Sequence, residues 1–81
     1  MYVLKYRGDE YYFRVMSEIA YFLNSRYGSS VSMNLISKKI NGDYVIPRRV
    51  HEKTKILYDV SIERVEYSDE MYRKYREQVF N

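Results

Sequence analysis

The chain has 81 residues, of which 46% are hydrophobic and 31% charged, and its net charge is +3 at pH 7. This length accommodates a single domain, residues 1–81, because domains cluster near ~100 to 150 residues. With no cysteine and only one histidine, His51, we expect no disulfide, no metal and no cofactor. The first residues contain no apolar stretch long enough for a signal peptide, and no apolar run approaches the ~18 residues of a membrane span, so we expect a cytoplasmic protein without a membrane partner.

The N-terminal third predicts a β-hairpin followed by a helix. Residues 2–6 and 11–15 are rich in β-branched and aromatic side chains, and Gly8 lies in the segment that must reverse the chain between them. Beyond them the apolar residues recur with helical spacing. Ser17 is therefore expected to cap a helix and Gly28 to end it.

A second helix is predicted after the serines of residues 29–32, with Ser30 or Ser32 as its cap and its end near Asn41 and Gly42. Its apolar residues share one side, and a polar, partly basic set falls on the other: Asn34, Ser37, Lys38 and Asn41. Residues 44–46 then predict a short strand, which Pro47 would place at a sheet edge or in a turn.

The C-terminal third predicts a strand and a helix. Residues 54–67 alternate in polarity, which is typical of one long half-buried strand with Ile56, Tyr58, Val60 and Ile62 on its inner face. The alternation shifts by one residue at Val65 and Tyr67, which indicates a bulge or the end of the strand. Ser68 is expected to cap the last helix, whose inner face would carry Tyr72, Tyr75 and Val79. The predicted fold is α+β, with a small, mostly antiparallel sheet and three short helices in the order ββ-α-α-β-β-α.

The positive charge is concentrated in one window of the chain. Residues 38–55 hold six basic and two acidic side chains, a net charge of +4 that exceeds that of the whole chain. A solvated surface would explain such a cluster equally well. A phosphate-binding surface is the functional interpretation, and its basic residues are Lys38, Lys39, Arg48, Arg49 and Lys53.

The two central helices are typical of a helix-turn-helix, whose second helix enters the major groove of DNA. In that arrangement Asn34 can read adenine, Ser37 can reach a base or a phosphate, and Lys38 can bind guanine or a phosphate. The segment between the helices is longer than the 3–4 residues usual for the motif. An αα-hairpin packed on a sheet, with no role in nucleic-acid binding, is the alternative.

Several short motifs in residues 1–46 also resemble a known module. They are Tyr2–Tyr6 with Gly8 and Phe13, then Met16–Leu23, then Val31-Ser32 and Ile36–Gly42, and last Tyr44–Ile46. Together they resemble the DNA-binding repeat appended to phage and intron homing endonucleases. The resemblance implies that the second helix contacts double-stranded DNA through Asn34, Ser37, Lys38 and Asn41. Residues 53–81 do not match the module, and no nuclease motif accompanies it.

We therefore expect a DNA-binding transcriptional regulator of phage or mobile-element type. The alternative is a small phage-encoded inhibitor, an anti-defence factor such as an anti-CRISPR-like protein or a host-takeover factor. It would bind a host or defence protein through Tyr67, Tyr72, Arg73, Tyr75 and Arg76, because Tyr and Arg are enriched at interface centres. Tight specific DNA binding would need a homodimer, and the C-terminal helix is its expected surface. Catalysis is not expected, since no acid/base pair can be recognised.

Overall fold

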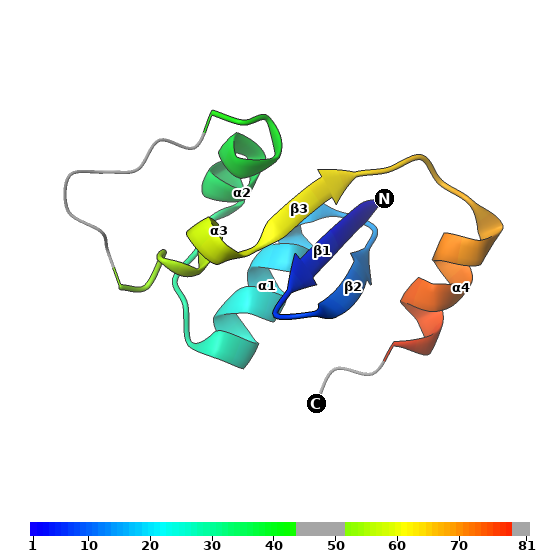
Figure 1. Cartoon of the computed structure of the whole chain (residues 1–81), viewed down its shortest axis with the longest axis horizontal. Coiled ribbons are helices and arrows are strands. Elements are labelled where there is room, and N and C mark those ends of the chain that lie inside the picture. The colour runs from blue at the N-terminus through cyan, green and yellow to red at the C-terminus, as the bar shows by residue number, and fades with distance from the viewer. Residues whose placement is uncertain (44–51, 79–81) are drawn as a thin grey trace.

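The computed structural model describes residues 1–43 and 52–78. The predicted strand at residues 44–46, the basic residues Arg48 and Arg49, and Val79 lie outside these residues. In chain order the elements are β1 (Tyr2–Tyr6), β2 (Asp9–Phe13), α1 (Met16–Tyr27), α2 (Met33–Ile40), α3 (Ile56–Asp59), β3 (Ser61–Arg64) and α4 (Asp69–Glu77) (Figure 1). The α+β class is confirmed, but the described part holds four helices where three were predicted for the chain.

The strands form an antiparallel sheet in the order β2-β1-β3. The β1–β2 hairpin closes through two residues, Arg7 and Gly8, both of which have a positive φ (51° and 85°). Two such residues make the turn whose twist matches that of the paired strands. The hairpin is thus confirmed, although its second strand begins at Asp9 and ends at Phe13, earlier than the predicted residues 11–15.

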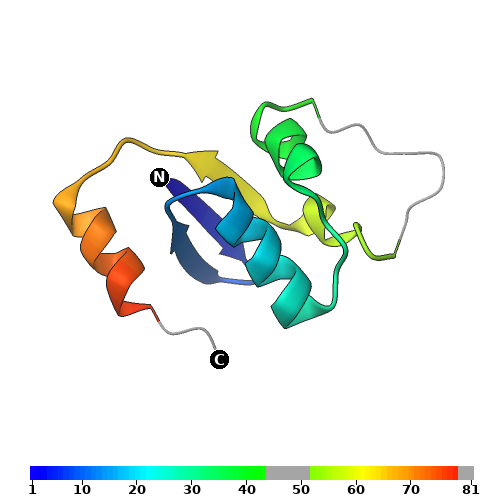
Figure 2. The same ribbon diagram turned by 180° about the vertical axis from the view of Figure 1, so that it is seen from behind.

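Helix α1 covers one face of the sheet, as Figure 2 shows from behind. The prediction that Ser17 caps it is wrong, because the helix begins at Met16 and its N-cap is Val15. Valine has no side-chain acceptor, and Glu18 reaches back instead: its Oε1 accepts hydrogen bonds from the backbone N–H of Arg14 (3.0 Å) and of Val15 (3.2 Å). Gly28 ends the helix in the left-handed conformation (φ 67°), as predicted.

The prediction of one long strand over residues 54–67 is wrong. Residues 56–59 form the short helix α3, and only Ser61–Arg64 are a strand, which pairs with β1. Leu57, which the alternation placed on the exposed side, is fully buried. A helical turn brings Leu57 and Val60 to the same side at spacing i, i+3, so both side chains reach the core, whereas a continuous strand would direct them to opposite faces.

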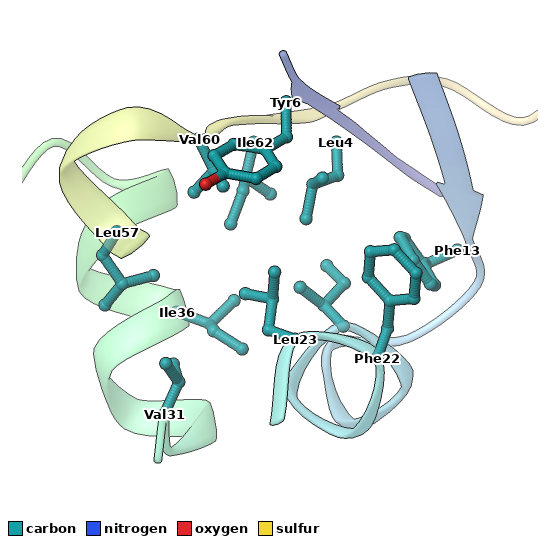
Figure 3. Packing of buried hydrophobic residues seen from close by; sticks show 11 residues of the cluster. Leu4, Tyr6, Phe13, Phe22, Leu23, Val31, Ile36, Leu57, Val60 and Ile62 are labelled. Atoms are coloured by element: carbon teal, nitrogen blue, oxygen red, sulfur yellow. The ribbon is translucent and has the colours of Figure 1, made fainter. Parts of the chain in front are cut away.

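The core lies between the sheet and helices α1, α2 and α3 (Figure 3). Each of these elements contributes apolar side chains to one buried cluster: Leu4, Tyr6, Phe13, Ile19, Phe22, Leu23, Val31, Ile36, Leu57, Val60 and Ile62. Helix α4 contributes none, since it has no buried residue. It lies beside the outer edge of β2, while α2 and α3 lie beyond the edge formed by β3 (Figures 1 and 2).

Candidate nucleic-acid interface

The outer face of α2 carries a row of polar side chains. Asn34, Lys38 and Asn41 are all exposed, and their spacing of i, i+4 and i+7 aligns them on one side of the helix. Ser37 lies beside them and is half-buried. Ile36 points the other way and is fully buried in the core. Four of the predicted DNA-binding residues are therefore together on one face, which we call the α2 outer face.

Local hydrogen bonds set both ends of α2. Ser32 is the N-cap, one of the two predicted candidates, and its Oγ accepts a hydrogen bond from the N–H of Leu35 (3.2 Å). At the other end, Asn41 is the C-cap and Gly42 follows with a φ of 78°. The helix is only eight residues long, so its orientation depends on tertiary contacts more than on helix propensity.

The joint between α1 and α2 is held by the carboxamide of Asn24. Its Oδ1 accepts hydrogen bonds from the N–H of Val31 (2.8 Å) and the hydroxyl of Ser29 (2.9 Å), and its Nδ2 donates to the carbonyl of Val31 (3.0 Å). Both partners of Asn24 lie in residues 28–32, the long segment between the two helices. Asn24 was not among the residues predicted from the sequence, although an Asn one turn before a helix-ending glycine is well placed to pair with the backbone beyond it.

The predicted phosphate-binding residues do not all share this face. Lys38 is exposed on the α2 outer face, but the half-buried Lys39 lies one residue on and is turned about 100° around the helix axis. Lys53 is exposed, and its carbonyl accepts a hydrogen bond from the N–H of Ser30 (2.8 Å), which places it beside the joint that leads into α2. Within residues 1–43 and 52–78, Lys38 forms no ion pair.

Helix α4 holds the residues of the alternative protein interface. Ser68 caps it as predicted, and its Oγ accepts a hydrogen bond from the N–H of Met71 (3.2 Å). The rings of Tyr67, Tyr72 and Tyr75 follow one another with centroids 5.9 and 6.0 Å apart. Tyr67, Arg73 and Arg76 are exposed, whereas Tyr72 and Tyr75 are only half-buried and do not enter the core.

Polar contacts join α4 to the rest of the protein. The carboxamide of Gln78 pairs with the backbone of Tyr12: Oε1 accepts from its N–H (2.8 Å) and Nε2 donates to its carbonyl. This amide occupies hydrogen-bonding groups on the outer edge of β2, where a further strand would otherwise bind. Nothing in the sequence indicated this role for Gln78.

Tyr75 makes the second polar contact of α4. Its hydroxyl donates a hydrogen bond to Oε2 of Glu18 on α1. This hydrogen bond, with partial burial, raises the pKa of Tyr75 above its ordinary value of 10.0, because the neutral phenol is the donor and the neighbouring carboxylate repels a phenolate. Tyr75 is therefore engaged within the chain, and of the predicted interface residues it is the least suited to bind a partner.

The described residues contain no group of three or more metal-ligating side chains, and none of their helices is long and apolar enough to cross a membrane. No family model matches the chain, and neither a curated protein nor a solved structure matches it.

Proposed function

We propose that the protein is a small DNA-binding protein, of the regulatory type found in phages and mobile elements, whose α2 enters the major groove. The observation that supports this most directly is the α2 outer face. Three exposed polar residues align on it, and the opposite side of the helix is anchored by the fully buried Ile36. A recognition helix needs this division, since one side must pack firmly while the other meets base edges.

The dimensions of the α2 outer face suit the major groove. An α-helix with its side chains is about 10 to 12 Å in diameter, which fits within a groove about 12 Å wide. From Asn34 to Asn41 the helix rises about 10 Å, at 1.5 Å per residue. Base pairs lie about 3.4 Å apart, so the face can address about three of them. In this proposal Asn34 reads adenine, and Lys38 binds guanine or a nearby phosphate.

Phosphate contacts on both sides of the groove would orient the helix. Lys53 is suited to this role, because it is exposed beside the joint that precedes α2. Arg48 and Arg49 lie outside the described residues, and their phosphate contacts stay a prediction from the sequence. Lys39 is the least suited of the predicted set, because it is half-buried and turned away from the α2 outer face.

A titration of labelled duplex DNA, followed by fluorescence anisotropy at low and moderate salt, tests the proposal. Binding should weaken steeply with salt. Lys38→Ala should reduce the affinity for every sequence, and Asn34→Ala should mainly reduce the preference between sequences. Lys74→Ala is the matched control, because it removes the same charge from an exposed helical lysine on α4. Equal losses in Lys38→Ala and Lys74→Ala, or no binding at low salt, would contradict the proposal.

A second candidate, inhibition of another protein, is favoured by one feature of α4. Tyr72, Arg73 and Arg76 line a shallow depression with Asp69 and Glu77. A pocket with an aromatic wall and two guanidinium groups resembles the centre of many protein interfaces. Arg73→Ala with Arg76→Ala would then abolish capture of a defined partner while leaving DNA binding unchanged. Loss of DNA binding in this variant, with unchanged capture of the partner, would exclude this candidate.

A further inference from the structure

A groove of about 560 Å³ runs along α1 on the flank that faces the β2 edge. Its lining is Phe13 from β2 and, from α1, Ser17, Glu18, Tyr21, Phe22, Ser25 and Arg26. Tyr21 stands at the centre of the α1 stretch and is 76% exposed, more than any other large hydrophobic residue of the described chain. The small residues Ser17 and Ser25 flank it one turn away on either side, so another helix can approach closely there.

The α1 residues of this groove are arranged so that the groove complements a copy of itself. Glu18 lies toward one end and Arg26 two turns further along, about 12 Å away at 1.5 Å per residue, with Tyr21 and Phe22 between them. When two copies of α1 pair antiparallel about an axis at the level of Phe22, one residue from Tyr21, each Glu18 comes opposite the partner copy's Arg26. A two-fold interface requires this kind of self-complementarity.

The charges are suited to such a pairing. Glu18 already accepts hydrogen bonds from the N–H of Arg14 and Val15 at Oε1 and from the hydroxyl of Tyr75 at Oε2, so its Oε2 keeps one acceptor site for the partner copy's Arg26. The guanidinium of Arg26 lies over the rings of Tyr11, Phe22 and Tyr27, and no carboxylate of residues 1–43 and 52–78 forms an ion pair with it. The rings hold the guanidinium in place, and a planar guanidinium retains donors at its edge for a carboxylate. We propose that the α1 groove binds the α1 groove of a second copy of this chain, forming a two-fold homodimer.

This proposal differs from the sequence-based hypothesis that the dimer forms through α4, and it does not rest on DNA binding. It leaves α2 accessible, because none of the residues that line the groove belongs to α2 or to the segment that leads into it. Figures 1 and 2 both show α2 and α4 on opposite sides of the unit formed by α1 and the sheet. A dimer through α1 therefore leaves the α2 outer face of both copies free.

Sedimentation equilibrium without DNA tests the proposal, at protein concentrations from about 1 µM to about 1 mM, which span weak to moderate association. The wild-type mass should rise from 9.9 kDa toward twice that value. Tyr21→Lys should stay at 9.9 kDa, because it places two like charges together near the axis. Tyr67→Lys makes the same change at a tyrosine that is 62% exposed outside the groove, and it should associate as the wild type does.

Cross-linking provides a second readout, because the chain has no cysteine. Under mild oxidation Tyr21→Cys should form a disulfide-linked dimer, while Tyr67→Cys should stay a monomer, since only residue 21 lies near its own copy. Circular dichroism verifies that each variant folds. A wild-type mass that stays at 9.9 kDa, unimpaired association of Tyr21→Lys, or equally fast cross-linking of Tyr67→Cys would overturn the proposal.

Discussion

Replacing Asn24 with alanine removes the three hydrogen bonds that hold the joint between α1 and α2. The backbone N–H and carbonyl of Val31 then lose their partners, and each partly buried group left unsatisfied costs about 1 kcal/mol, the low end of the range for buried groups. Alanine is the better helix former by about 0.5 kcal/mol, which offsets part of the loss. The expected net loss in free energy of unfolding is about 1.5 kcal/mol.

Urea denaturation measures this loss as a lower midpoint with an unchanged m-value. Ser29→Ala is the graded control, because it removes only one of the three bonds, and its loss should be well under half as large. Asn24→Ala should also weaken DNA binding, since the orientation of α2 depends on the joint. A free energy of unfolding within about 0.5 kcal/mol of the wild type, the usual range for surface substitutions, would refute the structural role of Asn24.

Three further predictions concern the core and α4. Leu57→Ala should lower the free energy of unfolding by about 2 to 5 kcal/mol in thermal or chemical denaturation, because Leu57 is fully buried, and a change below about 1 kcal/mol would contradict the assignment of α3. Gln78→Ala should speed amide hydrogen exchange at Tyr12 and in α4 but not at Leu4. Exchange rates at Tyr12 and in α4 that equal those of the wild type would show that the Gln78 contact is unimportant. Tyr75 has a folded-state pKa above its unfolded value, so its contribution to stability is complete below about pH 10 and is lost as pH rises through the folded pKa. As the pH rises above about 10, the free energy of unfolding of Tyr75→Phe should therefore fall less than that of the wild type in denaturation at fixed temperature, and identical pH profiles would count against the Glu18 contact.

The elements that local signals specify could be predicted from the sequence. The hairpin has a glycine at its turn, α1 ends at Gly28, and Ser32 and Ser68 cap their helices. The segment 54–67 could not be assigned from periodicity alone. Alternation at residues 56–62 and the helical spacing of Leu57 and Val60 coexist there, and contact with the core decides between them.

The candidate site could likewise be predicted from the sequence only in part. The α2 outer face follows from helical periodicity, so Asn34, Lys38 and Asn41 could be grouped from the sequence. The contacts that hold that face in place could not be predicted from the sequence, because the hydrogen bonds of Asn24 cross the joint between two helices. The α4 contacts of Gln78 and Tyr75 join residues more than fifty positions apart, and no local pattern records such pairs.

The salt dependence of DNA affinity is the sharpest test of the proposal that α2 and the joint before it bind the DNA backbone and bases. Each phosphate contact contributes about 0.9 to the slope of log affinity against log salt. Lys38→Ala with Lys53→Ala should therefore lower the magnitude of that slope by about 1.8 relative to the wild type. Arg73→Ala with Arg76→Ala, which removes the same charge from α4, should leave the slope unchanged. An unchanged slope in the first variant, or an equal decrease in both, would show that α2 and the joint before it do not bind the DNA backbone.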